Sequence, residues 1–223
     1  MERFSRSELL FGKENMDKLK FAHVLVVGIG GVGGYVCEVL ARGGVGNLSI
    51  VDFDNVSESN INRQIIALSS TIGRPKVEVM KERIFEINPN CNVLTYNVKV
   101  NKETIGRIFD DKFDFVVDAI DDLNGKVLLA KTCQENGIKI ISSMGAGNRI
   151  SIPNFKIDDL FKTHNDPLSK KFRKLARDNK IESLMVCYSP DDSIKSAKVG
   201  STSFYPSACG ITIGAYVIGK LVE

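Results

Sequence analysis

The sequence predicts an α/β fold in which a mainly parallel β-sheet carries helices on both faces. Short apolar runs alternate with helical patterns over most of the 223 residues, and this alternation is typical of βαβ units. A glycine-rich turn, VVGIGGVGG, joins the first apolar run to the first helical pattern. Because an aspartate ends the next apolar run, the expected sheet is Rossmann-like.

The alternating patterns give the expected order of elements. Strands are expected at Val24–Val27, Leu48–Val51, Val93–Val98, Phe113–Val117 and Ile138–Ser142. Helices are expected at Gly31–Arg42, from about Arg74 onwards, at Lys102–Phe109 and at Leu123–Asn136. The buried face of the second helix is predicted from residues that recur at helical spacing, namely Val77, Met80, Ile84 and Ile87.

After Ser142 the pattern loosens into a loop, and PLSKKFRKLARDNK then predicts a helix that is rich in cations. Its apolar face would consist of Leu168, Phe172, Leu175 and Ala176, and its other faces of Lys170, Lys171, Arg173, Lys174 and Arg177. These cations are either the solvated face of a surface helix or a phosphate-binding patch for nucleic acid. The run alone does not decide between the two.

The stretch from Ser201 to Gly219 carries no charge and includes the apolar segment ACGITIGAYVIG. This apolar core is shorter than the ~20 residues that a membrane span needs, so a buried helix is expected and no membrane partner. Gly210 and Gly214 would let another element pack closely against it.

Composition predicts one large α/β domain spanning residues 1–223. A hydrophobic content of 43% and a charged content of 26% are ordinary for a soluble globular protein. The net charge of +3 does not demand a polyanionic partner but permits one if the cations cluster. The polar start MERFSRSELLFGKEN is unlike a signal peptide, so a cytoplasmic location is expected.

The five cysteines are odd in number, scattered and never arranged as C-x-x-C. This spacing argues against a disulfide framework and against a four-thiolate zinc site. Cys37 falls inside a helical pattern and is expected to be a small buried hydrophobe. The sequence assigns no clear role to His23 or His164.

The glycine turn predicts a nucleotide. Gly28, Gly30 and Gly33 form G-x-G-x-x-G, and Asp52 follows roughly 20 residues on. Glycines let the backbone approach a pyrophosphate, whose charge the N–H groups of the helix N-terminus bind. The fingerprint alone does not distinguish NAD from other nucleotides.

Two cations after Asp52 favour a triphosphate over a nicotinamide. Arg63 and Lys76 flank a polar loop, and Lys76 follows Pro75, which is expected at the first helical position. A cation in the first turn opposes the helix dipole unless an anion lies beside it, and a triphosphate would supply that anion. The alternative is that both are ordinary surface residues.

Three aspartates, Asp118, Asp121 and Asp122, follow the fourth apolar run. Open α/β sheets bind ligands at this end of their strands, and carboxylates beside a polyphosphate suit Mg²⁺. The alternative is N-capping of the next helix by Asp121 or Asp122. Together with the glycine turn and the two cations, the aspartates indicate an ATP site.

The same segments resemble a known family. GIGGVGG, VDFD, SNINRQ, GRPKVE and DAIDD look like the serial motifs of the ThiF/MoeB/HesA superfamily, the adenylating relatives of ubiquitin-activating enzymes. The match runs in order through essentially the whole chain and implies a ThiF/MoeB-type adenylation fold. Sulfur-transfer activators of this superfamily usually carry two C-x-x-C pairs for zinc, which this chain lacks, so no zinc is expected.

The resemblance also implies the site residues. ATP would be bound by Gly28, Gly30, Gly31, Gly33, Asp52, Asn60, Arg63, Lys76 and Asp122. Within this set Asp52 would hold the ribose, while Asn60, Arg63 and Lys76 would contact the phosphates. Asp121 would hold Mg²⁺. Arg6 matches an arginine that reaches the phosphates of the partner subunit, which implies a homodimer and places Arg6 among the catalytic residues with Arg63, Lys76 and Asp121.

The second half of the chain is similar to one branch of the superfamily, the tRNA threonylcarbamoyladenosine dehydratases. The similarity lies in ISSMGAGNRISIPNFKIDDLFKTHNDPLSKKFRKLARD and GSTSFYPSACG, although SIPN stands where a Pro-Thr-Lys turn is expected. It implies ATP-dependent adenylation and cyclisation of a carboxylate on tRNA, with release of AMP and pyrophosphate. A monovalent cation near Gly145 and a sulfur-relay partner stay open.

Three other functions share parts of this pattern. An activator of a ubiquitin-like sulfur-carrier protein would use the same ATP-binding residues. It would differ only in the half of the chain that binds the acceptor. A nicotinamide-dependent oxidoreductase would need only the glycine turn and Asp52. A non-catalytic nucleotide-binding module would bind ATP without turning it over.

Overall fold

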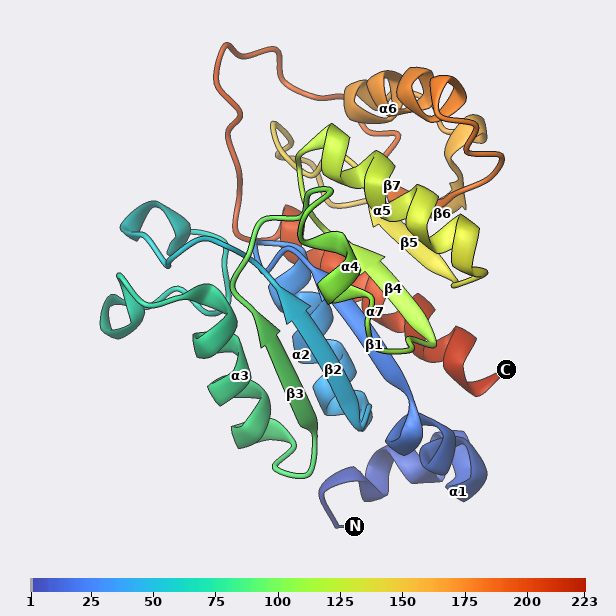
Figure 1. Ribbon diagram of the computed structural model, residues 1–223. Coiled ribbons are helices and arrows are strands. Elements are labelled where there is room, and N and C mark those ends of the chain that lie inside the picture. Colours follow the sequence, from blue (N-terminus) through green and yellow to red (C-terminus); the bar gives the residue numbers. More distant parts are fainter. Residues whose placement is uncertain (1) are drawn as a thin grey trace.

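The computed structural model describes residues 2–223 and arranges them around a seven-stranded sheet (Figure 1). The strand order is β3-β2-β1-β4-β5-β7-β6, and every pairing is parallel except that of β6 with β7. The predicted mainly parallel α/β sheet is confirmed. The strands are β1 (His23–Val27), β2 (Asn47–Val51), β3 (Asn92–Tyr96), β4 (Phe115–Asp118), β5 (Ile140–Ser143), β6 (Lys156–Asp159) and β7 (Met185–Tyr188).

Helices cover both faces of this sheet (Figure 1). One apolar cluster joins α2, α3 and α7 to the sheet, and a second cluster on the other face joins α4 and α5 to it. The helices are α1 (Ser5–Phe21), α2 (Gly33–Gly43), α3 (Lys76–Ile87), α4 (Ile105–Ile108), α5 (Leu123–Asn136), α6 (Pro167–Asp178) and α7 (Tyr205–Val222). Single 3₁₀ turns lie at η1 (Glu2–Phe4), η2 (Glu58–Asn60), η3 (Ser69–Thr71) and η4 (Leu160–Lys162).

The alternation of side chains along β1 explains the two clusters. Val24 and Val26 face α2 and α7, whereas Leu25 and Val27 face α5, and all four are at most 1% exposed. A strand that is buried on both faces is apolar throughout, which is why this run could be recognised in the sequence.

The uncharged C-terminal stretch is a core helix, as predicted. A Cβ at Gly210 would lie 2.4 Å from the carbonyl oxygen of Val32, and one at Gly214 would lie 2.7 Å from the Cβ of Val39. The two glycines therefore let α7 lie directly on α2. Across residues 2–223, no helix combines the length and the apolar character that crossing a membrane requires.

Several predicted boundaries move. Leu123–Asn136 is the observed extent of α5, but α3 starts at Lys76, and Pro75 is its N-cap rather than its first helical residue. The helix predicted over Lys102–Phe109 shrinks to the single turn of α4. The Asn101 side chain accepts hydrogen bonds from the backbone of residues 103 and 104, and this local turn replaces the first helical turn.

Three elements have no counterpart among the predictions: α1, β6 and β7. α1 bends at Gly12, which has a φ of 76° and ψ of 161°, and most of its surface is exposed, so its apolar residues follow no single stripe. β6 has the sequence KIDD and lies at the sheet edge, where polar residues are tolerated. β7 is only four residues long, and so short an apolar run shows no periodicity that distinguishes a strand from a helix.

The order of the strands creates a crevice for a ligand. From β1 the chain adds β2 and β3 on one side, and it then returns to add β4 and β5 on the other side. The loops that follow β1 and β4 therefore diverge, and open α/β sheets bind ligands at this switch point.

Candidate adenylation site

The glycine turn lies between the carboxyl ends of β1, β2 and β4. Gly28 has a φ of 92°, and its N–H donates to the carbonyl of Val51 at 2.7 Å. A Cβ at Gly28 would lie 2.7 Å from the carbonyl oxygen of Ala119, and one at Gly33 would lie 1.8 Å from the carbonyl oxygen of Gly28. Side chains at these two positions would force the three loops apart, so both must be glycine.

Asp52 connects the end of β2 to this turn. Its carboxylate accepts hydrogen bonds from the N–H of Ile29 at 2.6 Å and from the N–H of Asp54 at 2.9 Å. The residue is 9% exposed. Two amide donors fix the orientation of the carboxylate, and the remaining lone pairs could accept hydroxyl donors from a ribose.

Lys76 reaches Asp52 and Asp54 from the start of α3. Its Nζ lies 2.8 Å from Oδ2 of Asp54 and 3.8 Å from Oδ1 of Asp52, and the residue is 5% exposed. The anion that this position at the helix start calls for is thus already present within the chain, so the position of Lys76 does not by itself require a triphosphate. Asp54 has half of its side chain exposed, so a phosphate could replace it as the partner of Lys76.

Asn60 and Arg63 belong to an arm, residues 56–73, that projects on the left of Figure 1. Asn60 is 9% exposed, and its Oδ1 accepts the N–H of Ser57 at 3.1 Å. The Arg63 guanidinium donates to the carbonyl of Ser59 at 2.9 Å, and its Cγ would lie 3.4 Å from a Cβ at Gly31. Arg63 therefore lies against the glycine turn with its charge half exposed.

Gln64 is a site residue that the sequence analysis missed. It is 7% exposed, its Oε1 has no hydrogen-bond partner within residues 2–223, and its Nε2 lies 3.9 Å from where a Cβ of Gly30 would be. A buried amide oxygen without a partner is costly, and a donor group of a bound nucleotide would satisfy it. Gln64 is the last residue of the motif SNINRQ, which was the signal for it, although no role was assigned to it.

The aspartates after β4 separate into different roles. Asp118 is fully buried, 3.1 Å from the Nζ of Lys126 and 2.6 Å from the Oγ of Ser142, so it is structural. Asp122 caps α5 by accepting the N–H of Gly125 at 2.8 Å, as the capping alternative predicted. Asp121 is exposed, and in the described part of the chain its carboxylate has no hydrogen bond or ion pair. Of the three, Asp121 is therefore the one open to a cation.

Arg6 lies near the end of the sheet where the strands begin, whereas the glycine turn lies where they end. It is exposed on α1, whose backbone at Leu19 accepts the N–H of Gly46, just before β2, at 3.0 Å. Arg3, just before α1, donates to the carbonyl of Glu86 near the end of α3 at 3.0 Å. Both contacts are with segments that precede strands, so α1, the helix that carries Arg6, lies at the end of the sheet opposite the glycine turn (Figure 1).

The predicted cationic helix is α6, and its cations are not equivalent. Its buried face includes Phe172 and Ala176, as predicted, whereas Leu168 and Leu175 are only partly buried. Arg173 donates to the carbonyl of Thr163 at 2.9 Å and to its hydroxyl, so this guanidinium holds the helix to the preceding turn. The exposed cations are Lys170, Lys171, Lys174 and Arg177.

Near Gly145, where a monovalent cation was left open, the structure places the guanidinium of Arg149. It donates to the carbonyl of Gly145 at 2.7 Å and to that of Ser189 at 3.2 Å. The positive charge among these carbonyls is therefore supplied by a side chain. Among residues 2–223, no three His, Cys, Asp or Glu side chains gather in a metal-binding group.

The cysteines and histidines are not arranged for catalysis. All five thiols are buried, and burial raises the pKa of Cys91 and of Cys133 to about 12. Buried thiols with such values are protonated at neutral pH and are poor nucleophiles. His23 contacts the Ser49 hydroxyl at 2.9 Å, and His164 contacts the Tyr188 hydroxyl at 3.3 Å.

The site defines a nucleotide-binding α/β domain. At the switch point of the mainly parallel sheet it brings together a glycine turn, a fixed carboxylate, a lysine and an arginine. The chain belongs to the ThiF family, whose model matches residues 4–194.

Individual relatives extend this similarity over the whole chain. The tRNA threonylcarbamoyladenosine dehydratase of Bacillus subtilis is 39% identical, with all of this chain and 96% of the relative covered. The crystal structure of Escherichia coli TcdA, a tRNA N6-threonylcarbamoyladenosine dehydratase, in complex with AMP superposes with a TM-score of 0.94 at 32% identity, covering 99% of this chain and 94% of the other. A molybdopterin-synthase adenylyltransferase of Haemophilus influenzae is 35% identical, but the match covers 72% of this chain and 65% of the relative.

Proposed function

We propose that the chain is an ATP-dependent tRNA threonylcarbamoyladenosine dehydratase. It adenylates the carboxylate of the modified adenosine and cyclises it, and AMP and pyrophosphate are released. One adenylation domain, residues 1–223, carries the whole reaction.

The observation that carries this proposal is a similarity that extends over the acceptor half. The dehydratase of Bacillus subtilis matches all of this chain, whereas the molybdopterin-synthase adenylyltransferase matches 72% of it. Both classes share the residues that bind ATP, so only the part of the chain that binds the acceptor of the adenylate distinguishes them. The full-length match therefore favours the dehydratase over the activator of a sulfur-carrier protein.

In the first step the threonylcarbamoyl carboxylate attacks the α-phosphorus of ATP, and pyrophosphate leaves with the bonding electron pair. The amides at the start of α2 and the cations of Arg63 and Lys76 would stabilise the charge that grows on the phosphate oxygens. Asp52 would hold the ribose. This chemistry requires positioning rather than a nucleophile from the protein.

Magnesium is part of this proposal through Asp121. Mg²⁺ usually keeps several waters and takes one or two carboxylates plus phosphate oxygens, and the exposed, unpaired Asp121 carboxylate fits that requirement. When bound, the ion would neutralise pyrophosphate charge. Asp122 would contribute to the ATP site indirectly, by fixing the start of α5, because its carboxylate is engaged in the N-cap of that helix.

In the second step the neighbouring carbamoyl oxygen attacks the activated carboxyl carbon. AMP leaves, a carbamoyl N–H loses its proton, and a five-membered ring closes. The net change is the loss of one water at the expense of ATP. No thiolate is needed, which agrees with the burial of all five cysteines.

A homodimer completes the proposed site. Arg6 is exposed on α1, which lies at the end of the sheet opposite the glycine turn, so it could reach phosphates only in a second subunit. Three large apolar side chains of α1 are also unusually exposed, Leu9 at 80%, Leu10 at 85% and Phe21 at 74%. A partner surface would bury them.

The tRNA substrate would dock on α6. Lys170, Lys171 and Lys174 are exposed and form no ion pairs in residues 2–223, so they could take up backbone phosphates. A cytoplasmic location follows for an enzyme that acts on tRNA. A sulfur-relay protein is an additional partner to be tested by co-purification.

The deciding experiment is mass spectrometry of tRNA nucleosides after incubation of tRNA with the protein, ATP and Mg²⁺. The expected product is a nucleoside lighter by one water, together with AMP and pyrophosphate. A ubiquitin-like sulfur-carrier protein is offered in parallel as an acceptor. If the carrier is adenylated and the tRNA is unchanged, the sulfur-carrier function replaces the dehydratase.

A further inference from the structure

Arg149 lies where the loops after β5 and β7 meet the start of α6. Its side chain is only 2% exposed. Besides Gly145 and Ser189, the guanidinium donates to the carbonyl of Asp191 at 3.2 Å and to the carboxylate of Asp166 at 3.4 Å. One side chain thus holds two loops and the beginning of a helix.

Asp166 transmits this anchoring to α6. It is the N-cap of the helix, where its Oδ1 accepts the N–H of Ser169 at 2.7 Å and its carbonyl accepts the N–H of Lys170 at 3.0 Å. The first exposed lysine of α6 is therefore one turn away from the carboxylate that Arg149 contacts.

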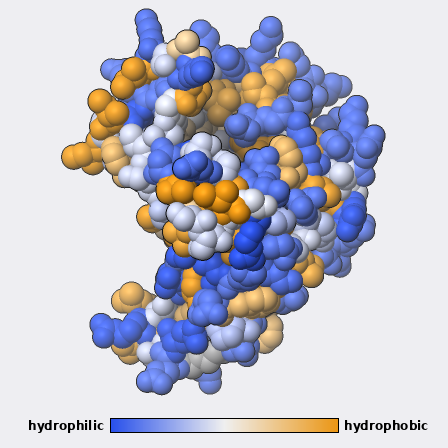
Figure 2. Space-filling view, turned by 90° about the vertical axis from the view of Figure 1, so that its left-hand side faces the viewer, coloured by the Kyte–Doolittle hydropathy of each residue, from blue (hydrophilic) through white to orange (hydrophobic). Residues whose placement is uncertain are grey.

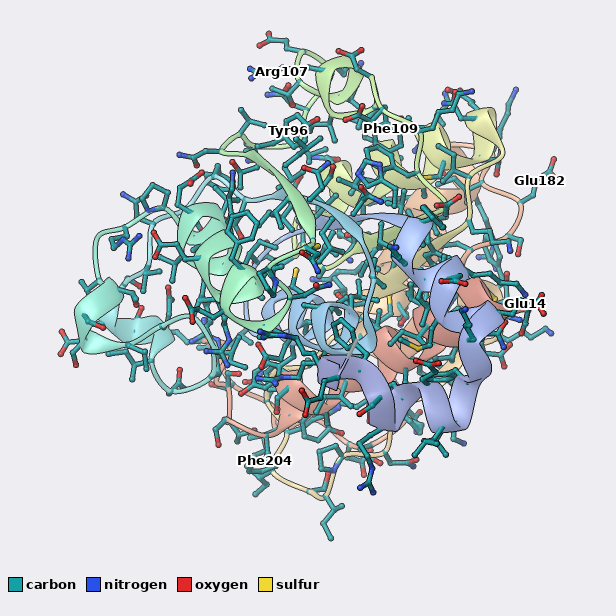
Figure 3. All side chains as sticks on the ribbon, turned by 90° about the horizontal axis from the view of Figure 1, so that it is seen from below. Glu14, Tyr96, Arg107, Phe109, Glu182 and Phe204 are labelled. Atoms are coloured by element: carbon teal, nitrogen blue, oxygen red, sulfur yellow. The ribbon has the colours of Figure 1, made fainter. Side chains whose placement is uncertain are left out.

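Asp191 links Arg149 in the other direction, to the glycine turn. Its carboxylate accepts the hydroxyl of Tyr205 at 2.6 Å, and the Tyr205 ring lies 5.8 Å from the Arg149 guanidinium. Tyr205 begins α7, directly after Phe204, which is labelled in Figure 3. The next residue, Pro206, would lie 3.0 Å from a Cβ at Gly31.

Only arginine supplies a charge with this many donors in one plane. A lysine would keep the charge but could not reach carbonyls and a carboxylate that lie on different sides of the group. The acceptors around Arg149 are buried or half-buried, so its loss would leave Asp166, itself 3% exposed, without its counter-charge.

We propose that Arg149 is a positioning residue for the tRNA half of the reaction. It fixes the loops and α6 relative to the glycine turn, so that a carboxylate on tRNA bound along α6 meets the nucleotide in the correct orientation. The inference rests on the proposed dehydratase function. It separates Arg149 from the residues that contact ATP.

The test measures kcat and KM for tRNA, the Kd for ATP and the melting temperature of Arg149→Ala and Arg149→Lys. We expect kcat/KM for tRNA to fall about 100-fold in the alanine variant and about tenfold in the lysine variant, because displacement by an ångström has effects of this order. The ATP affinity should stay at the wild-type value. Guanidinium ions added to Arg149→Ala should restore part of kcat/KM for tRNA.

Arg83→Ala is the matched control. It removes a guanidinium that pairs with Glu38 between α2 and α3, so it lowers stability without touching the loops or α6. If it reduces tRNA turnover as much as Arg149→Ala, loss of stability explains both, and the inference is overturned.

Two other results separate this inference from the function on which it rests. If wild-type protein produces no cyclised nucleoside, the proposed function fails and the inference falls with it. If the wild type cyclises tRNA but both Arg149 variants keep its kcat/KM, or lose ATP affinity in parallel, the inference alone is wrong. If Arg149→Ala does not fold, Arg149→Lys is compared with the wild type in the same two quantities, kcat/KM for tRNA and the Kd for ATP.

Discussion

Lys76 carries a charge that its neighbours already balance, and this determines how it can act on a nucleotide. Asp54 is its nearest partner at 2.8 Å and Asp52 the next at 3.8 Å. Because Lys76 is almost fully buried, a phosphate must replace Asp54 rather than add to it. Arg63 differs, since within residues 2–223 its guanidinium bonds only to Ser59 and Asn62 of the arm, and both bonds could be exchanged for bonds to a ligand.

This difference predicts two separable phenotypes. Arg63→Ala and Lys76→Ala should each reduce kcat by about 10²–10³, the usual effect of removing one donor to a developing charge. Lys76→Ala should also lower the melting temperature, because it leaves Asp52 and Asp54 without their cation, whereas Arg63→Ala should melt like the wild type. Pyrophosphate release and thermal melting measure the two effects. Near-normal release by Arg63→Ala would remove Arg63 from the site.

A second prediction at this scale distinguishes the two aspartates that precede α5. Asp121→Asn should raise the Mg²⁺ concentration needed for half-maximal activity, because it weakens the only carboxylate of the three that is open to a cation. Asp122→Asn should have little effect, since asparagine caps a helix about as well as aspartate. Titration of Mg²⁺ in both variants is the measurement. An unchanged magnesium dependence in Asp121→Asn contradicts its assignment.

Sequence motifs could predict which residues belong to one site. They could not predict which polar groups of these residues already have hydrogen-bond or ion-pair partners within the chain. The motifs assigned Asp52 and Lys76 to one ATP site, and in the structure the Nζ of Lys76 lies 3.8 Å from Oδ1 of Asp52. The burial of Asp118 against Lys126 depends on an i, i+8 contact across the start of α5, which no local pattern encodes. Gln64 lies in the quoted motif SNINRQ, but its role was missed because the sequence does not show that its amide oxygen is buried without a partner.

Between elements, Glu38 joins α2 to α3. Its carboxylate lies 2.7 Å from Arg42 on the same helix and 2.6 Å from Arg83 on α3. Burial raises the pKa of this carboxyl, but the hydrogen bonds from Arg83 and Arg42 outweigh burial, so the pKa lies below its ordinary value. Ionised Glu38 therefore stabilises the fold above the carboxyl's unfolded pKa, and this contribution is lost as the pH falls through the folded pKa.

Glu38→Gln should accordingly lower the free energy of unfolding at neutral pH by about 1–3 kcal/mol, the usual cost of leaving partly buried charges unpaired. The difference from wild type should shrink as the pH falls through the lowered pKa of Glu38, where the wild-type carboxyl also becomes protonated. Melting curves of both proteins across this range are the measurement. A difference that does not depend on pH would indicate a packing effect instead.

The helix α6 gives a prediction about the substrate. Each cation that contacts a phosphate contributes about 0.7–0.9 log units of affinity per decade of salt, so Lys170→Glu, Lys171→Glu and Lys174→Glu together should weaken tRNA binding and flatten its salt dependence. ATP affinity should not change. The control reverses three exposed lysines elsewhere, Lys102, Lys112 and Lys139, with the same change in net charge. Equal losses in both triple variants would mean that net charge, and not α6, governs binding.

The elements that the sequence revealed are those with two-sided burial or a clear apolar stripe. β1 is buried on both faces, and the predicted extents of β1 and α5 are within a residue of the structure. β6 and β7 extend the sheet with four residues each, and β6 carries charges on an edge that water can reach. Their pairing is set by tertiary contacts rather than by local preference.

At the scale of the whole molecule, the exposed apolar residues lie away from the core clusters. The arm carries Ile61, Leu68 and Ile72, each more than 40% exposed, and Figure 2 looks onto the side from which it projects, where apolar residues are interspersed among hydrophilic ones. The exposed Leu9 and Leu10 lie on α1 at the opposite edge of the sheet. Such separated surfaces fit a symmetric dimer, in which the same patches are used by both copies.

If the dimer is real, Arg6 should act in trans, and mixing two inactive proteins should restore activity. In a mixed dimer of Arg6→Ala and Arg63→Ala chains, the site built on the Arg6→Ala chain has its own Arg63 and receives Arg6 from its partner. Random exchange at equal concentrations should give about a quarter of the wild-type number of intact sites. Pyrophosphate release is measured after exchange has been verified with differently tagged chains. Activity that stays at the level of the separate variants, despite verified exchange, would show that Arg6 serves its own chain or none, and that the site is complete without a second copy.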